Sequence, residues 1–185
     1  MNVRVMLSAV LLAGLLTGLH TPAWAEARPG WSLFLNSGRF FVQDTTDNSQ
    51  YRGDSLGAGL DRQFALGSHF SLLLFVNEVK QELTLPSRPE DRYLVADVLG
   101  LEARLWLGPL YVGAYRARYY LSTAQSATSV RLGASGPGYG FTAGLEGGSG
   151  WYAGARGFWA QGLQMREGPH VDLSGTLIAV GYRWR

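Results

Sequence analysis

Residues 99–121, "LGLEARLWLGPLYVGAYRARYYL", decide the fold of this chain. The stretch is almost apolar enough for a membrane helix, but Glu102, Arg104, Arg116 and Arg118 interrupt it, and within each half the charges stand at alternate positions. Side chains of a β-strand point alternately to opposite faces, so this spacing gives each half one apolar face and one charged or small-residue face. The stretch therefore predicts two amphipathic strands joined by a tight turn.

The length of that turn decides how the two strands pair. A three-residue turn, Gly108-Pro109-Leu110, sets Glu102 opposite Arg116, whereas a two-residue turn sets Glu102 opposite Tyr115. A one-residue slip moves every side chain to the other face, and an arginine on a lipid-facing wall costs about 2–4 kcal/mol near the bilayer midplane. The sequence therefore favours the three-residue turn, with all four charges on the inner face.

Turn and polar clusters divide the rest of the chain into eight candidate strands. They cover residues 31–44, 56–66, 69–83, 93–107, 110–122, 139–147, 151–165 and 173–184. The connectors after the second, fourth and sixth strands are short, and the other four are longer and polar. Loops sorted by length onto alternate ends are typical of small outer-membrane barrels. The pattern predicts an all-β fold, an eight-stranded antiparallel up-and-down transmembrane β-barrel.

The start of the chain has the order of a secretory signal peptide. Arg4 precedes an apolar run over 5–19, and Ala23-Trp24-Ala25 ends it with small residues on either side of one large residue. A single membrane helix is the alternative, but the run is short. We expect residues 1–25 to be removed and residues 26–185 to form one barrel domain.

Composition excludes several classes of function. The chain has no cysteine, so it can form neither a disulfide framework nor a thiolate metal site. Its 16 Lys and Arg residues nearly balance 14 Asp and Glu residues, which argues against a nucleic-acid partner. Beyond the first 25 residues no stretch reaches the roughly 18 consecutive apolar residues of a membrane helix. No spacing of histidines and carboxylates indicates a metal, and no cofactor is expected.

Alternation along the strands predicts a charged lumen. Its members are Asp61, Glu102, Arg104, Arg116, Arg118, Glu146, Arg156 and Arg183. Eight strands enclose a space that side chains can fill, and unpaired charges there would be severely destabilising. We therefore expect ion pairs that plug the lumen; a conducting pore is the alternative.

Aromatic residues lie near the strand ends, where an interfacial belt would place them. The predicted belt consists of Trp31, Tyr93, Tyr111, Tyr119, Tyr139, Trp151 and Trp184. Tryptophan and tyrosine favour the headgroup level, with the ring buried and the polar tip in water. The alternative is the aromatic core of a soluble barrel.

The whole organisation after residue 25 resembles the small outer-membrane barrels of the OmpA and OmpX type. The final "VGYRWR" is similar to the alternating, aromatic-ended last strand that such barrels present to the assembly machinery, although Arg185 follows Trp184. The scaffold also resembles the lipid A 3-O-deacylase (PagL-like) barrels, whose seventh strand carries His-x-Ser. The matching positions here hold Trp159 and Gln161, so that catalytic pair does not carry over.

A weaker catalytic candidate is local. His170 could act as a base for Ser174, with Asp172 or Glu167 orienting it. Isolated histidine and serine residues near a loop are more often plain surface residues, so we expect no catalysis from them.

Basic loop residues suggest a surface role. They are Arg52, Arg88, Arg92, Arg131 and Arg166. Arginine pairs well with phosphate, so these residues could contact lipopolysaccharide, although loop acids could pair with them instead. The expected function is a non-catalytic outer-membrane barrel with a structural or surface-binding role, whose partners are membrane lipid, lipopolysaccharide and the assembly machinery. The alternatives are a lipid A-modifying ester hydrolase with a rearranged site and a soluble, lipocalin-like periplasmic barrel.

Overall fold

The computed structural model describes residues 27–45, 50–82, 93–124, 130–165 and 170–184. Eight strands make up nearly all of this part of the chain. They are β1 Gly30–Asp44, β2 Gln50–Ala65, β3 Phe70–Glu82, β4 Tyr93–Leu107, β5 Leu110–Ala124, β6 Val130–Glu146, β7 Trp151–Met165 and β8 His170–Trp184. Within these ranges there is no helix long and apolar enough to cross a membrane.

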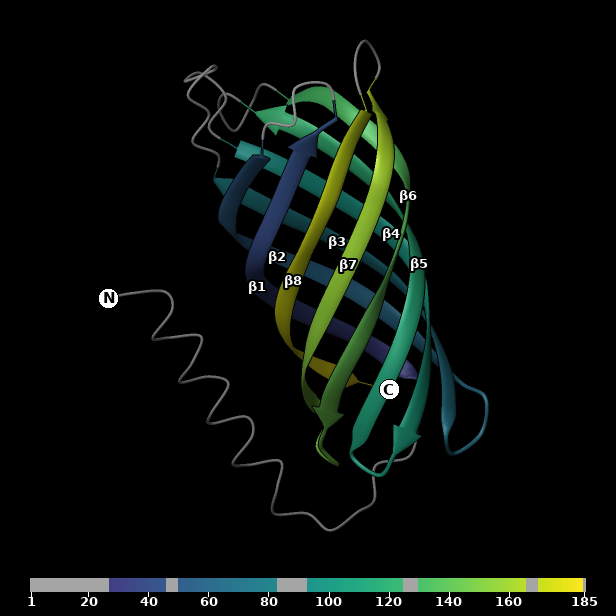
Figure 1. Ribbon diagram of the computed structural model, residues 1–185. Coiled ribbons are helices and arrows are strands. Elements are labelled where there is room, and N and C mark those ends of the chain that lie inside the picture. The colour runs from purple at the N-terminus through teal and green to yellow at the C-terminus, as the bar shows by residue number, and fades with distance from the viewer. Residues whose placement is uncertain (1–26, 46–49, 83–92, 125–129, 166–169, 185) are drawn as a thin grey trace, which may run out of the picture.

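Each strand pairs antiparallel with its neighbour in the chain, and β8 pairs with β1 to close the barrel. Figure 1 shows strongly tilted strands wrapped side by side into a barrel. The all-β class, the eight strands and the up-and-down order are therefore confirmed. We call the end that carries connectors 66–69, 108–109 and 147–150 the turn end, and the opposite end the loop end.

The pairing register measures the stagger of the barrel. One row of directly paired, outward-facing residues starts at Trp31 and returns to β1 at Phe41, ten positions further on (41 − 31). At about 3.3 Å per residue and a tilt of roughly 40°, the row climbs about 25 Å around the barrel, or about 3 Å per strand. We call it the exterior row: Trp31, Arg62, Leu74, Leu101, Arg116, Tyr139, Trp159, Ser174 and Phe41.

Alternate residues of each strand are buried and exposed, as the period of two requires. The first and third strands, which are apolar on both faces, turn Phe34, Phe40, Leu73 and Phe75 into the lumen. The largest difference from the sequence pattern is in β6, which begins at Val130, nine residues earlier than expected. Its first half, "VRLGASGPG", has the composition of a loop, but most of it pairs with β5.

The connector between β4 and β5 contains two residues, Gly108 and Pro109, and Leu107 pairs with Leu110. The expected three-residue turn is therefore wrong. Gly108 has φ +64°, a left-handed conformation that glycine adopts without steric cost and that tight hairpins require. Glu102 consequently lies opposite Tyr115, and Arg116 lies opposite Leu101.

An irregularity in β7 resets the alternation near its loop end. The register with β8 shifts between Ala160 and Leu163, where Gly162 has φ +61°. The Gly162 backbone N–H donates to Asp172 Oδ1 at 2.7 Å. Leu163, which simple alternation would turn outward, is therefore fully buried in the lumen.

Candidate functional site

Glu102 of β4 is the centre of one lumen ion cluster. Its carboxylate is fully buried and accepts hydrogen bonds from Arg104 Nε at 2.5 Å and from Arg156 of β7 at 2.9 Å. Thr142 of β6 donates a third bond at 2.6 Å. Alternation places each of these side chains in the lumen, and the closure of the barrel brings three strands to one carboxylate.

Arg183 of β8 is the centre of a second cluster. Its guanidinium pairs with Glu146 of β6 and, at 3.3 Å, with Asp61 of β2. Tyr152 of β7 donates to the other oxygen of Asp61 at 3.2 Å. Asp61, Glu146 and Arg183 are all buried.

The two clusters leave the lumen without net charge. Within the described residues the charged groups that face inward are three carboxylates and three guanidinium groups: Asp61, Glu102, Glu146, Arg104, Arg156 and Arg183. Each of the six has at least one ionic partner. The arrangement satisfies the condition under which buried charge is tolerated, which is close pairing with additional hydrogen bonds.

Aromatic and aliphatic side chains fill the lumen toward the loop end. Phe40 packs edge-on against Phe158 at 4.8 Å, and Phe75 packs in the same way against Tyr115 at 5.4 Å. The Arg156 guanidinium lies 4.3 Å from the Phe75 ring centroid and so joins the ionic and apolar halves. Two lumen cavities measure about 20 and 10 Å³, about the size that a single water molecule requires.

Arg116 and Arg118 do not belong to this lumen set. The two-residue turn directs both side chains outward, where they are exposed, and turns Tyr115 inward. The prediction that they line the lumen is therefore wrong, as is the predicted pair of Glu102 and Arg116. Glu102 pairs instead with Arg156, 54 positions away in the chain.

Tyr111 and Tyr119, expected in the aromatic belt, also lie in the lumen. The signal that sequence reasoning missed is the glycine-rich inner face of β6. A Cβ built on Gly140 would lie 2.5 Å from the Tyr115 ring, and one on Gly144 would lie 2.5 Å from the Tyr111 ring. The missing side chains at Gly140 and Gly144 thus make room for the tyrosines of β5, and this fit favours the observed register.

Two aromatic belts surround the outer wall. At the turn end, Trp31, Trp151 and Trp184 are each a little over 40% exposed, as expected, and Tyr182 packs against Trp151 at 5.3 Å. Arg62 lies over the Trp31 ring at 5.4 Å.

The second belt lies nearer the loop end. Tyr139 stacks on Trp159 at 6.0 Å, and Tyr93 packs against Lys80 Nζ at 4.1 Å. Tyr120 is also exposed there. Between the belts the exposed wall is mainly apolar, including Leu33, Leu35, Leu74, Val76, Leu99, Leu101, Val112, Phe141 and Ile178.

Comparison with solved structures fits this geometry. No protein-family model and no curated protein matches the chain. The neisserial surface protein A (NspA) is 13% identical, with a TM-score of 0.57 over 84% of this chain and 97% of that one. The chain has the fold of a small outer-membrane barrel of the OmpA/OmpX type.

Two further structures of small outer-membrane barrels are similar. Ail of Yersinia pestis, in complex with the heparin analogue sucrose octasulfate, is 11% identical, with a TM-score of 0.47 over 85% of this chain and 99% of that one. The N-terminal barrel domain of Pseudomonas aeruginosa OprF is 11% identical, with a TM-score of 0.44 over 84% of this chain and all (100%) of that domain.

In this small outer-membrane barrel fold the candidate catalytic residues His170, Asp172 and Ser174 occupy alternate positions of β8. His170 and Ser174 are four residues apart on one extended strand, or about 13 Å. Asp172 accepts the Gly162 backbone N–H, so its carboxylate has a structural partner on β7. The strand does not bring the three side chains together, and among the described residues no cluster of three metal-ligating side chains occurs.

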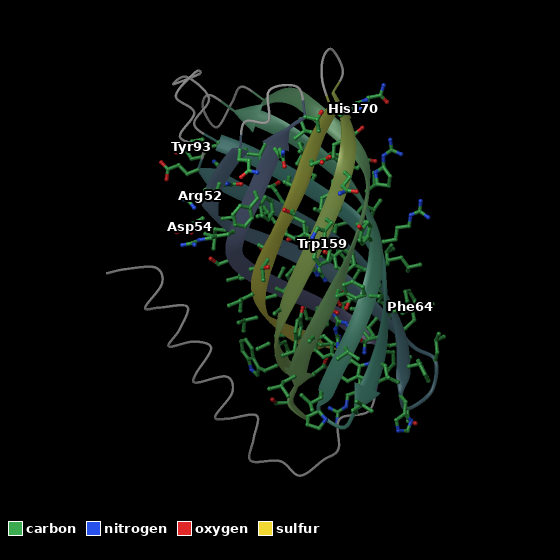
Figure 2. All side chains as sticks on the ribbon, viewed as in Figure 1. Arg52, Asp54, Phe64, Tyr93, Trp159 and His170 are labelled. Atoms are coloured by element: carbon green, nitrogen blue, oxygen red, sulfur yellow. The ribbon has the colours of Figure 1, made fainter. Side chains whose placement is uncertain are left out.

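The basic residues expected in loops are distributed differently. Arg52 is an exposed residue of β2 near the loop end, as Figure 2 shows, and Arg131 lies within β6. Arg88, Arg92 and Arg166 lie outside the described residues. Asp54, beside Arg52 in Figure 2, pairs with Arg39 at 3.1 Å on the outer wall.

Proposed function

We propose that this protein is a sealed barrel of the bacterial outer membrane that acts through its outer surface and not as a channel. The wall between the two aromatic belts would cross the bilayer, the turn end would face the periplasm, and the loop end would face outward. The mainly apolar exterior and the belt positions of tryptophan and tyrosine support the membrane-crossing wall, and the short connectors at the turn end support this orientation. Residues 1–25 would be the export signal, and the alternating last strand would be read by the assembly machinery.

The observation that carries the proposal is the neutral, filled lumen inside an apolar wall. A soluble barrel that binds an apolar ligand would reverse this arrangement, with polar residues outside and an apolar cavity within. A pore would need a continuous water path, whereas the Glu102 and Arg183 clusters bring side chains from opposite walls together across the lumen. A structural role, or binding by the loop end and the outer wall, is the function that remains.

Four measurements on one expressed sample test the proposal. We expect the protein in the outer-membrane fraction, with a mass equal to that of residues 26–185. We expect its gel mobility to change on boiling, as for a stable membrane barrel. Planar bilayers that contain the purified protein should show no steady conductance. A soluble periplasmic protein, or a reproducible open channel, would overturn the proposal.

A further inference from the structure

Two arginines on the outer wall of β5 lack any partner that would explain their position. Arg116 and Arg118 are exposed, and neither forms an ion pair with any described residue. Their paired neighbours on β4 are Leu101 and Leu99, which are themselves exposed and apolar. Guanidinium groups on a lipid-facing wall are destabilising unless an anion or water reaches them.

The exterior row gives the level of these arginines. Arg116 stands four strands from Trp31, so it lies about 12 Å above the turn-end belt at about 3 Å per strand. Tyr139 and Trp159 are the next two members of the row. Arg118 lies one outward position higher, 5.7 Å from the Tyr120 ring. The backbone of Arg116 therefore lies near the middle of the roughly 25-Å apolar band, and that of Arg118 lies about 5 Å higher. A long arginine side chain that runs up the wall to keep its charged head in water brings both guanidinium groups toward the loop-end belt, where headgroups meet acyl chains.

An apolar groove of about 430 Å³ on the wall leads to the same place. Its apolar lining includes Leu33, Ala58, Leu60, Val76 and Leu99. Ala58 opens the hollow because its small side chain stands where its outward neighbours on β2 carry leucines. On β5 the groove is lined by Tyr120, whose ring lies 5.7 Å from the Arg118 guanidinium. Leu99, which also lines the groove, pairs with Arg118, so this end of the groove adjoins Arg118.

The charges around the groove limit where an anion can bind. Glu78 and Asp97 line its upper part and pair directly across β3 and β4. Their carboxylates would repel a phosphate over those strands. Two cationic positions of the described wall remain near the groove: Lys80 of β3, whose ammonium lies 4.1 Å from the Tyr93 ring, and the Arg116 and Arg118 pair of β5. The β5 position is the more favourable for a phosphate because it presents two guanidinium groups.

We propose that Arg116 and Arg118 bind a phosphate of lipopolysaccharide in the outer leaflet and that the adjoining groove holds one of its acyl chains. Arginine presents paired N–H donors that match phosphate oxygens, and the groove supplies apolar contact directly below. The inference rests on the proposed outer-membrane location. It adds a specific lipid site on the wall, separate from the loops.

The test is native mass spectrometry of the full mature barrel in octyl glucoside, titrated with diphosphoryl lipid A and with its dephosphorylated form. We expect the diphosphoryl form to bind at least tenfold more tightly. Arg116→Gln and Arg118→Gln should each remove about tenfold, the loss expected for one charge-assisted contact. Arg116→Lys should retain part of the affinity. Ala58→Leu should weaken both forms equally by filling the groove.

The matched control is Arg62→Gln, which removes an outward arginine from the turn-end belt and should leave the preference for phosphate unchanged. An equal loss in Arg62→Gln, or full affinity in the Arg116→Gln/Arg118→Gln variant, would overturn the inference. Heat-modifiable mobility of each variant shows that the barrel has formed, so failure of this site is distinct from failure of the proposed function.

Discussion

Replacing Glu102 by glutamine tests the lumen plug most directly. The substitution keeps the shape of the side chain but removes the charge that faces Arg104, Arg156 and Thr142 at 2.5, 2.9 and 2.6 Å. The lumen then changes from neutral to a net charge of +1, with two guanidinium groups left without their carboxylate.

The magnitude follows from these contacts. Charge-assisted hydrogen bonds contribute about 1.5–3 kcal/mol each, and the glutamine carbonyl can still accept part of them. Arg156 keeps its contact with the Phe75 ring, and Arg104 keeps its contact with the Tyr111 ring at 4.2 Å. The remaining term is the uncompensated buried charge, so we expect E102Q to lower the free energy of unfolding by about 3–5 kcal/mol.

The assay is equilibrium urea unfolding of the barrel in lipid vesicles, followed by tryptophan fluorescence. Glu82→Gln is the control, because Glu82 is an exposed carboxylate at the loop end of β3 with no ion pair among the described residues; it should change stability by less than about 0.5 kcal/mol. The E102Q/R104Q double variant restores neutrality, and its loss should be smaller than the sum of the two single losses by about 1–3 kcal/mol. A cost for E102Q below about 1 kcal/mol, or strictly additive losses, would refute the reasoning.

Three further predictions concern the register and the outer wall. Gly140→Ala should destabilise the barrel by about 1–3 kcal/mol because its Cβ meets both the Tyr115 ring and the Gly157 carbonyl oxygen; Gly157→Ala, whose Cβ would lie 3.7 Å from the Trp159 ring, should cost less than about 1 kcal/mol in the same urea titration. A nitroxide label at Arg116→Cys should be accessible to oxygen dissolved in the bilayer, whereas a label at Glu102→Cys should be shielded; shielding of both labels would restore the three-residue turn. His170→Ala should leave the acyl-chain count of lipid A, measured by mass spectrometry of the expressing cells, equal to that with the unaltered protein, and a difference between the two would revive the hydrolase alternative.

The observed set of lumen residues has no net charge, whereas the predicted set had one. The sequence-based set held three acids and five arginines, an excess of two positive charges in a low-dielectric space. Directing Arg116 and Arg118 outward leaves three of each sign, all paired. The net charge of the candidate lumen residues therefore argues against the three-residue turn. The sequence-based choice of turn considered only the alternation of side chains and the cost of an arginine in lipid, and did not consider this net charge.

The amino-acid sequence by itself determined the class of fold, the number and order of strands, and the inward position of Asp61, Glu102, Arg104, Glu146, Arg156 and Arg183. Those properties follow from a period of two along each strand and from the ranking of connector lengths, both of which are local. Only the tertiary structure decided the face of β5 and the partners of each charge. The face of β5 depends on whether tyrosine rings fit against Gly140 and Gly144 on the next strand, and partners such as Asp61 and Arg183 are 122 positions apart. Contacts that form only when the barrel closes cannot be read from the spacing within a strand.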